Sequence, residues 1–504
     1  MRFPLVLNAT PMPPRYRLAI DRPSLIQRLY VFLFILLPGA CWYWGNGLSG
    51  EYWYLVWLAP VPTLVSPAYT DRKTSFLFAF VACLMGRLSW FVYLHTVVPP
   101  VLASLLTGAL AYAFARIAVY AGVQLCTKRN WRSLFTYPVL MTAFEYLVLT
   151  CSPDGTATSM AYTQSDVLPI IQSASLAGTP GITFLVSLFP ALCAFGWLAW
   201  QQRARILQAA GLALLIYGSV LGYGLLRLHA PMSSAALQAG VVVLDETKHH
   251  TDQQDSQQQM RAVLADYGRA ITTVAATGAQ VVLLPETAFR LTPLTDSLVM
   301  NSLRHMAKRA NTRLIVGLAD YSQPDAHNTA VVIDASGSLL TTYTKRHLVR
   351  GFESQFSAGR QTGLFPIDTL QAGVAICKDL DFPGTIRDYG QARTAVLFVP
   401  ANDFRIDDWL HARMAILRGV ENGFSVVRAA RHGRLTISDS RGRVLYEAKT
   451  TIGNQAQLIG TVPLSAKTTL FAYAGNWFGL LNLVVAFFIV LSYRRRTSVL
   501  RITN

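Results

Sequence analysis

Three side chains capable of acyl-transfer chemistry follow short β-prone runs in the second half of the chain. Glu286 follows Val281-Val-Leu-Leu-Pro, Lys345 follows Thr342-Tyr-Thr, and Cys377 follows Gly373-Val-Ala-Ile. The run before Cys377 predicts the end of a buried strand, and a nucleophile at a strand end stands where the chain turns and can expose it. A thiolate attacks acyl carbon atoms, a carboxylate can accept the thiol proton, and an ammonium group can stabilise an oxyanion. These residues suit acyl-transfer chemistry without a metal or other cofactor.

Each of the three residues also has an ordinary structural interpretation. A single cysteine is usually a small buried hydrophobe, Glu286 could be a carboxylate at a helix start, and Lys345 could be a solvated charge. The chain has six cysteines, and five of them lie in or beside apolar runs. Only Cys377 lies in the polar part of the chain. The occurrence of all three residues in one segment favours the catalytic interpretation.

The composition indicates a membrane protein. Hydrophobic residues make up 52% of the 504 residues and charged residues only 14%, far from ordinary soluble proteins. The net charge of +17 could suit a nucleic-acid binder. However, the basic residues flank the first and last apolar runs, at Arg15, Arg17, Arg22 and Arg28 and at Arg494, Arg495 and Arg496. This pattern fits the positive-inside rule, so we expect a bilayer partner and no nucleic acid.

Seven apolar runs between residues 24 and 230 approach the length of about 20 residues that a bilayer-spanning helix needs. They are Leu25–Trp44, Tyr52–Tyr69, Ser75–Val97, Val101–Leu125, Leu134–Cys151, Val167–Trp200, in which Gly178-Thr-Pro-Gly181 predicts a break, and Ile206–Leu228. The run Trp477–Ser492, with a possible start near Leu470, predicts one more span. Helix count and basic ends predict a cytoplasmic leader (1–23), about seven transmembrane helices (24–230), an extracytoplasmic domain (231–468), a C-terminal transmembrane helix (469–493) and a cytoplasmic tail (494–504).

From Leu237 onward, short β-prone runs alternate with helical patterns, which predicts a layered α/β domain. Strands are expected at Leu237–Leu244, Gln280–Leu284, Thr312–Gly317, Thr329–Asp334, Gly373–Ile376, Ala395–Val399, Ser425–Ala430, Thr436–Ser440 and Leu458–Val462. Helices are expected near Gln253–Thr277, Leu294–Ala310 and Trp409–Gly423. The sequence therefore predicts an α-helical membrane bundle plus an α/β domain.

The three motifs, in this order and with separations of about 59 and 32 residues, resemble the nitrilase (carbon–nitrogen hydrolase) superfamily. The resemblance implies a four-layer α-β-β-α sandwich, with Glu286 as base, Lys345 as oxyanion partner and Cys377 as nucleophile. It also implies supporting residues. Glu353 stands eight residues after Lys345, where many relatives carry a second glutamate, and Asp379 stands two after the cysteine. Asn402, with Asp403, follows a strand whose end should face the same cleft.

Membrane helices, then a nitrilase-like domain, then one more helix resemble the apolipoprotein N-acyltransferase family. Further marks are Pro285-Glu-Thr-Ala288 and, in the membrane part, Pro169-Ile-Ile-Gln-Ser-Ala-Ser-Leu-Ala-Gly178. The resemblance implies a multi-pass protein of the bacterial inner membrane whose catalytic domain faces the periplasm. It further implies that an acyl chain passes from a phospholipid, through a Cys377 thioester, to the N-terminal amine of a diacylglyceryl-cysteine lipoprotein. We expect a monomer.

The sequence departs from the family pattern at two places. The family usually has Pro-Phe-Gly-Glu after His-Leu-Val, where this chain has Arg350-Gly-Phe-Glu353, and Tyr-Glu after the cysteine, where it has Lys378-Asp379. These changes leave open a membrane-anchored amidase, or an acyltransferase with a different acceptor amine. A transporter or a non-catalytic scaffold is a third hypothesis, against which the intact Glu-Lys-Cys set argues.

Overall fold

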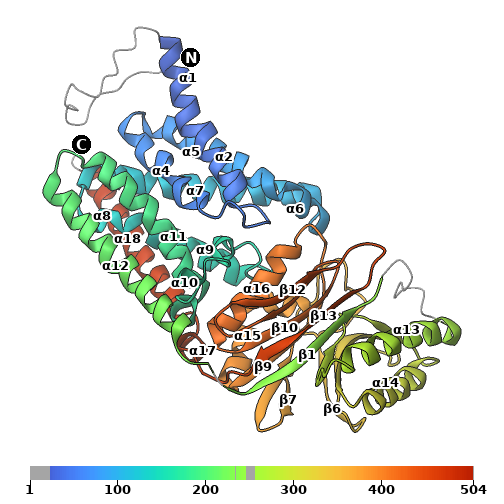
Figure 1. Ribbon diagram of the computed structural model, residues 1–504. Coiled ribbons are helices and arrows are strands. Elements are labelled where there is room, and N and C mark those ends of the chain that lie inside the picture. The colour runs from blue at the N-terminus through green and yellow to red at the C-terminus, as the bar shows by residue number, and fades with distance from the viewer. Residues whose placement is uncertain (1–22, 233, 246–255, 503–504) are drawn as a thin grey trace. The chain divides into compact units, whose positions relative to one another are not determined.

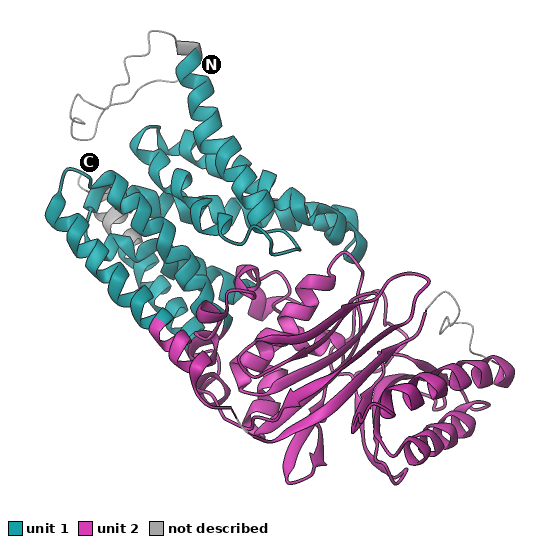
Figure 2. Cartoon of the chain, in the orientation of Figure 1, with its two compact units in different colours: residues 1–148, 179–221, 478–504 teal, residues 149–178, 222–477 magenta. Residues whose placement is uncertain are grey.

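The computed structural model describes residues 23–232, 234–245 and 256–502. Residues 1–22 of the predicted leader and the first three residues of the helix predicted at 253–277 lie outside this part of the chain. The chain divides into two compact units, drawn in teal and magenta in Figure 2. Unit 1 comprises residues 1–148, 179–221 and 478–504, and unit 2 comprises residues 149–178 and 222–477.

Unit 1 is helical. The helices that contribute to it are mostly apolar and are listed here with their full bounds: α1 Pro23–Val31, α2 Leu37–Gly45, α3 Leu55–Leu58, α4 Pro60–Val65, α5 Arg72–Arg87, α6 Phe91–Val97, α7 Pro100–Lys128, α8 Trp131–Leu134, α9 Thr136–Cys151, α11 Ala174–Leu198, α12 Arg203–His229 and α18 Trp477–Ile502 (Figure 1). Small residues allow close packing between them. A Cβ at Gly86 of α5 would stand 2.3 Å from the Cβ of Trp42 of α2.

Six helical stretches of the described chain are long and apolar enough to cross a membrane: Leu25–Gly45, Arg72–Val97, Pro100–Lys128, Trp131–Cys151, Ala174–Leu198 and Arg203–His229. The run at 52–69, which we predicted as a seventh span, contains shorter apolar helices between Leu55 and Ala68. Within α11, Gly178 has non-helical dihedral angles (φ 66°, ψ −167°), which confirms the predicted break. These lengths and compositions are those of a membrane protein.

Unit 2 is built around two β-sheets, the first of seven strands and the second of six. The first has the order β13-β1-β2-β4-β5-β6, with β3 also paired to β4. Its strands are β1 Ala236–Val243, β2 Val281–Leu283, β3 Phe289–Leu291, β4 Arg313–Asp320, β5 His327–Ile333, β6 Leu339–Thr344 and β13 Ala456–Pro463. The second has the order β12-β11-β10-β9-β8-β7. Its strands are β7 Gly363–Ile367, β8 Leu370–Val374, β9 Thr394–Asn402, β10 Ser425–Arg431, β11 Arg434–Ser438 and β12 Val444–Lys449.

Both sheets share one plan. Three central strands run parallel, β1-β2-β4 in the first sheet and β10-β9-β8 in the second, and antiparallel strands flank them. The carboxyl ends of parallel strands meet at one edge of a sheet, where the side chains that follow them gather. Glu286 follows β2 and Cys377 follows β8, so the plan brings both to strand ends.

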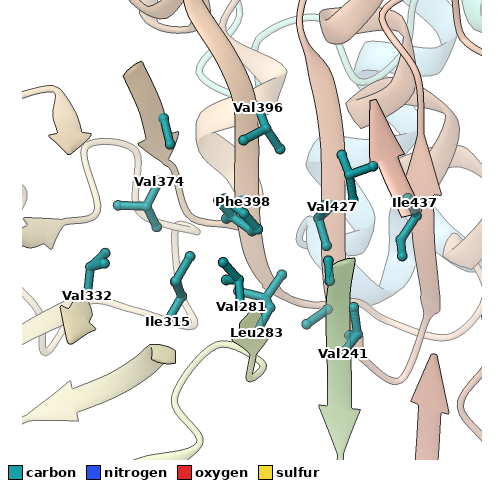
Figure 3. Close-up of a cluster of buried hydrophobic side chains, with 14 of the residues drawn as sticks. Val241, Val281, Leu283, Ile315, Val332, Val374, Val396, Phe398, Val427 and Ile437 are labelled. Carbon is teal, nitrogen blue, oxygen red and sulfur yellow. The ribbon is translucent and has the colours of Figure 1, made fainter. Parts of the chain in front are cut away.

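Apolar residues face both sides of each sheet, as the period of two in a strand requires. Val241, Leu283 and Ile315 of the first sheet pack against Val374 and Phe398 of the second, and form the core between the sheets (Figure 3). The alternate positions of the first sheet face helices α13 Gln257–Ala275 and α14 Asp296–Ala310. Those of the second sheet face α15 Pro383–Gln391 and α16 Asp408–Asn422. The unit is an α-β-β-α sandwich, which confirms the predicted fold class.

Two further segments complete unit 2. Residues 149–178 hold a short 3-10 helix, Met160–Gln164, and the short helix α10 Leu168–Ile171. Near the carboxyl end, α17 Leu470–Ala474 is separated from α18 by Gly475, whose φ is +65°. Because the chain turns at Gly475, the long helix begins at Trp477, where the predicted apolar run begins, and not at the possible earlier start near Leu470. The apolar part of this helix, Trp477–Ser492, is shorter than the six stretches of membrane-spanning length.

Candidate active site

Glu286 lies in a break between two strands. β2 and β3 both pair in parallel with β4, and residues 284–288 bulge between them. Gly317 of β4 faces this bulge, where a Cβ would stand 2.4 Å from the carbonyl oxygen of Pro285 and 2.6 Å from the Cα of Glu286. The backbone N–H of Ala288 donates to the carbonyl of Gly317 at 2.8 Å. The lack of a side chain at position 317 therefore lets the Glu286 backbone lie directly against β4.

Lys345 follows β6, the edge strand of the same sheet. Its backbone N–H donates to the carbonyl of Asn328 at 2.8 Å, which extends the pairing of β6 with β5 by one residue. Its buried Nζ lies 2.7 Å from Oε1 of Glu286 and 2.8 Å from Oε2 of Glu353. The charge of one ammonium group is therefore shared by two carboxylates.

Asn328 joins the same two carboxylates. Its Nδ2 donates to Oε1 of Glu286 at 2.7 Å and to Oε1 of Glu353 at 2.6 Å. Glu353 also accepts from the backbone N–H of Val349 at 2.7 Å. The predicted supporting residue Glu353 is therefore part of a buried network of two carboxylates, one ammonium and one amide. Asn328 was not predicted from the sequence. The feature that could have indicated it is a polar amide near the start of a strand whose following residues are buried.

Cys377 begins a 3-10 turn, Cys377–Asp381, that follows β8. Its φ of +43° lies in the left-handed region, which is rare for a residue with a side chain and costs conformational energy. Strained nucleophiles of this kind are held at sharp turns between a strand and a helix. Cys377 as a whole residue is partly exposed, and its Sγ lies 3.6 Å from the carbonyl oxygen of Asn402 at the end of β9.

The three side chains act on one another electrostatically. Burial raises the pKa of the Cys377 thiol and the Glu286 charge raises it further, while the Lys345 ammonium lowers it. Burial also raises the pKa of Glu286, against the opposing effect of Lys345. For Lys345, burial favours the neutral form, but the charges of Glu286, Cys377 and Glu353 outweigh it and raise the pKa. The arrangement is a neutral thiol beside a carboxylate of increased basicity and a firmly protonated lysine.

Asp379 connects the nucleophile turn to the segment after Lys345. Its Oδ1 accepts from the backbone N–H groups of Arg346 (3.1 Å) and His347 (2.9 Å). Its Oδ2 accepts from the Tyr343 hydroxyl at 2.7 Å and from the backbone N–H of Ile376 at 3.0 Å. A single carboxylate is thus bonded to residues before and after Lys345 and to the residue before Cys377.

Asn402 and Asp403 differ in their surroundings. The Asn402 side chain is exposed, and its Oδ1 lies 2.9 Å from Nδ1 of His432. The Asp403 carboxylate is buried and forms two hydrogen bonds with Arg428, at 3.0 and 2.5 Å. The Arg428 charge lowers the pKa of the Cys377 thiol and the Asp403 charge raises it, after burial and the nearer charges. The carbonyl of Asn402, rather than its side chain, faces the thiol.

The structure brings the predicted residues Glu286, Lys345 and Glu353 into one network. The charges of Glu286 and Lys345 act on the Cys377 thiol, and Asp379 is bonded to the backbone near Lys345 and Cys377. Their catalytic roles stay predictions. Sequence reasoning missed Asn328 and the Asp403–Arg428 pair, although an arginine in the middle of the otherwise apolar run Val426–Ala430 indicates a buried acidic partner. Among the described residues, no group of three or more His, Cys, Asp or Glu side chains is arranged to hold a metal ion.

Two protein-family models match the chain. The model described as carbon–nitrogen hydrolase matches residues 235–472, which is nearly all of the α/β part of unit 2. The model described as the apolipoprotein N-acyltransferase N-terminal domain matches residues 39–192. A solved amidase from Nesterenkonia sp. AN1, in complex with butyramide, is 19% identical, covers 46% of this chain and 94% of its own, and has a TM-score of 0.38.

Curated apolipoprotein N-acyltransferases match over most of the chain, and a curated amidase matches over a quarter of it. An apolipoprotein N-acyltransferase from Geobacter metallireducens is 24% identical over 465 residues, which are 84% of this chain and 88% of the relative. One from Haemophilus ducreyi is 24% identical over 471 residues, or 85% and 90% of the two chains. A 2-oxoglutaramate amidase from Bacillus subtilis is 30% identical over 125 residues, or 24% of this chain and 48% of the relative. The chain therefore carries a carbon–nitrogen hydrolase domain and an apolipoprotein N-acyltransferase N-terminal domain, and it is similar over most of its length to apolipoprotein N-acyltransferases.

Proposed function

We propose that this chain transfers an acyl chain from a phospholipid, through a thioester on Cys377, to the N-terminal amine of a diacylglyceryl-cysteine lipoprotein. The similarity to apolipoprotein N-acyltransferases over most of the chain supports an acyltransferase. One arrangement supports the mechanism above all: Lys345 lies within 2.8 Å of Glu286 and Glu353, and its charge and that of Glu286 both act on the Cys377 thiol. This arrangement supplies a nucleophile, a base and a cation at one place.

In the proposed first step, Glu286 accepts the proton of Cys377 while the sulfur attacks the ester carbonyl of the phospholipid. Because burial raises the pKa of the thiol, attack requires this transfer to the carboxylate. The oxyanion that forms is stabilised by the Lys345 ammonium and by the backbone N–H that follows Cys377. When the ester C–O bond breaks, the lysophospholipid oxygen takes the proton from Glu286, and the thioester remains.

In the second step, the α-amine of the acceptor attacks the thioester carbonyl. Glu286 accepts a proton from the amine, the carbon–sulfur bond breaks, and the Cys377 thiolate regains its proton. The net reaction converts one ester and one amine into one amide and one hydroxyl, with no redox change. Lys345 keeps its proton in both steps, because the charges around it raise its pKa.

The membrane helices support lipid substrates for both the acyl donor and the acceptor. Six helices are suited to cross a bilayer, and both proposed substrates carry acyl chains. We place the protein in the bacterial inner membrane as a monomer, with the α/β domain in the periplasm. The basic residues beside the first and last apolar runs favour cytoplasmic ends. This orientation requires the shorter apolar helices at Leu55–Ala68 and Trp477–Ser492 to complete a seventh and an eighth span. A cysteine introduced at the exposed Arg261 should react with a membrane-impermeant maleimide added to spheroplasts; protection of this residue would contradict the orientation.

Intact-protein mass spectrometry after incubation with phospholipid tests the proposal. Wild-type protein purified in detergent should gain one acyl mass that hydroxylamine removes, and Cys377→Ala should gain none while retaining its thermal unfolding temperature. Addition of a diacylglyceryl-cysteine peptide should discharge the adduct and yield the N-acyl peptide. An alanine variant that still transfers the acyl chain would refute the role of Cys377.

A second candidate is a membrane-anchored amidase, in which water resolves the thioester. Two observations support this second candidate. A stretch of 125 residues is similar to a 2-oxoglutaramate amidase, and the residues at 350–353 and 378–379 depart from the acyltransferase pattern. The same incubation separates the two functions. Release of free fatty acid at the same rate with and without the acceptor peptide would support hydrolysis, whereas acceptor-dependent discharge would support transfer.

A further inference from the structure

Lys378, one of the residues at which the sequence departs from the family pattern, is a buried cation next to the nucleophile. Its side chain is only 8% exposed, and its Nζ lies 2.5 Å from Oδ1 of Asp154. Burial of an ammonium group without a counter-charge is strongly unfavourable, so the pair determines where this side chain lies. Asp154 belongs to residues 149–178, which are part of unit 2 and lie more than 200 residues before Lys378 in sequence.

The residues that follow Asp154 are bonded to the other end of the same turn. The backbone N–H and the hydroxyl of Thr156 both donate to the carbonyl of Asp381, each at 2.8 Å. Gly155 has a φ of +55°, and a Cβ there would stand 2.4 Å from the same carbonyl oxygen. The turn Cys377–Asp381 is therefore held near its start by an ion pair and at its end by two hydrogen bonds.

We call residues 152–166 the strap. Its second half is bonded to α16 rather than to the nucleophile turn. The Tyr162 hydroxyl accepts from Nη2 of Arg418 at 2.7 Å, and Asp166 accepts from Nε of Arg413 at 2.7 Å. The two ion pairs of the strap are similar in exposure. The side chain of Asp166 is 46% exposed and that of its partner Arg413 is 10% exposed. The corresponding values are 48% for Asp154 and 8% for Lys378.

We propose that Asp154 and Lys378 are positioning residues that hold Cys377 and the following peptide N–H in the geometry required for acyl transfer. The proposal rests on the proposed function. The N–H that would stabilise the oxyanion belongs to Lys378 itself, so the position of its side chain and the orientation of that peptide are linked through one residue. The strained φ of Cys377 needs such support, because a residue in this region relaxes unless its surroundings hold it. Misplacement of a nucleophile by about 1 Å can cost about 100-fold in rate.

A different role for Lys378 would be binding of the anionic headgroup of the acyl donor. The ion pair with Asp154 and the burial of the side chain oppose this role, since a cation that is already paired offers little charge to a ligand. The two roles predict different kinetics. Loss of a headgroup contact raises KM for an anionic phospholipid, whereas loss of positioning lowers the rate of acylation at saturating donor.

The test compares Asp154→Asn, Lys378→Met and the double variant in the full-length protein in detergent. The rate of acyl-Cys377 formation is measured by mass spectrometry at several concentrations of phosphatidylglycerol and of phosphatidylethanolamine. We expect each single variant to lower the saturated rate about 10- to 100-fold with KM within about twofold of wild type. The double variant should be no slower than the slower single variant, because either change alone releases the turn. Lys378→Arg keeps the cation and should restore most of the rate.

Asp166→Asn is the matched control, because it removes a carboxylate of equal exposure from the same strap. It should leave the acylation rate within about threefold of wild type, since its partner lies on α16. A wild-type rate in Asp154→Asn, multiplicative losses in the double variant, or an equal loss in Asp166→Asn would overturn the proposal. A raised KM confined to phosphatidylglycerol in Lys378→Met would assign the headgroup role instead.

A second measurement does not depend on the proposed function. Alkylation of Cys377 by iodoacetamide needs no lipid, and its pH profile reports the environment of the thiol. Asp154→Asn should shift this profile relative to wild type and to Asp166→Asn, with no fall in the thermal unfolding temperature beyond that of the control. If wild-type protein forms no acyl adduct, the proposed function fails, while a shifted profile still supports the positioning role. An unchanged profile would count against the positioning role even where adducts form.

Discussion

Two buried cations near Cys377 are held in different ways. Lys345 lies between two carboxylates, those of Glu286 and Glu353, and Asn328 donates to both of these as well. Arg428 lies on β10 of the other sheet and pairs with one carboxylate, that of Asp403, through both of its terminal nitrogens. The first cluster has one carboxylate in excess, whereas the second is a one-to-one pair.

We expect this difference in charge balance and geometry to separate a reactive cluster from a structural one. Burial raises the pKa of Glu286 and the Glu353 charge raises it further, against the Lys345 charge, so this carboxylate can accept a proton from a thiol. Burial raises the pKa of Asp403 as well, but this carboxylate is bound by both terminal nitrogens of Arg428, whose planar fork suits a fixed geometry. Removal of each cation should therefore have different consequences, and the following predictions test that contrast.

The largest effect is expected for Lys345→Met. The change leaves Glu286 and Glu353 buried without a counter-charge and removes the cation proposed to stabilise the oxyanion. We expect acyl-Cys377 formation to fall about 1,000-fold or more. We also expect the free energy of unfolding to fall by about 3–5 kcal/mol, as for other buried pairs that lose one partner. Single-turnover acylation and denaturant unfolding in detergent measure the two quantities.

Glu353→Gln in the Lys345→Met background is the control for the stability loss. It removes the surplus carboxylate and keeps the side-chain shape, so it should recover part of the unfolding free energy without recovering acylation. Recovery of acylation in the double variant, or wild-type acylation in Lys345→Met, would show that the ammonium is not required for the chemistry.

Arg428→Met should affect stability more than chemistry. It leaves the Asp403 carboxylate buried and unpaired, which costs about 3–5 kcal/mol of unfolding free energy. The loss of the Arg428 charge also raises the pKa of the Cys377 thiol, but burial and the charges of Glu286 and Lys345 affect it more. Acylation by the folded fraction should therefore fall less than about tenfold, the change that one pKa unit produces. The same two measurements apply.

Replacement of both partners provides the control for Arg428. The variant Arg428→Met/Asp403→Leu removes the unpaired charge and should regain much of the lost stability, since apolar replacements of buried pairs are often tolerated. If folded Arg428→Met protein instead lost acylation as completely as Lys345→Met, the distinction between the two clusters would be wrong.

The central strands of the fold could be predicted from the sequence because burial on both faces gives continuous apolar runs. The predicted strand Leu237–Leu244 differs from β1 by one residue at each end, and Ser425–Ala430 differs from β10 by one residue at one end. The missed strands β7 and β12 are edge strands. Pro366 in β7, and Glu447 and Lys449 in β12, suit an edge but weaken a strand pattern. β3 has only three residues, too few for a period to appear.

The residues of the candidate site also fall into those that could be predicted from the sequence and those that could not. Glu286, Lys345 and Cys377 could be found because each lies within three residues of a strand end, where position along the chain indicates position in space. Asn328 and Asp154 could not, because their partners are distant in sequence: 42 residues separate Asn328 from Glu286, and 224 separate Asp154 from Lys378. Such contacts depend on how strands and loops pack, which no local pattern records.

A third, smaller effect concerns pH and extends the comparison to the surroundings of Arg428. Nδ1 of His411 on α16 lies 2.9 Å from Asp407 and 4.0 Å from Asp403. Burial lowers the pKa of His411, but the charges of Asp407, Asp381 and Asp403 outweigh it and raise the pKa to about 9. The protonated form is therefore favoured by folding. Its contribution, about 3 kcal/mol at most, is fully present below pH 6.5 and is lost as the pH rises through about 9.

The free energy of unfolding measured between pH 6 and 9.5 should therefore decline more steeply for wild-type protein than for His411→Gln, which does not titrate. The other group of this cluster with a large shift is Asp381, whose pKa burial raises to about 6. Its stabilising proton is lost between about pH 4 and 6, below the window in which His411 acts, so the two contributions can be distinguished. Equal slopes for the two proteins above pH 7 would mean that His411 is neutral in the fold. Asp407 would then have no protonated histidine as its partner, and the cluster around Arg428 would hold a carboxylate in excess of its cations. The contrast with the Lys345 cluster, which also has one carboxylate in excess, would weaken.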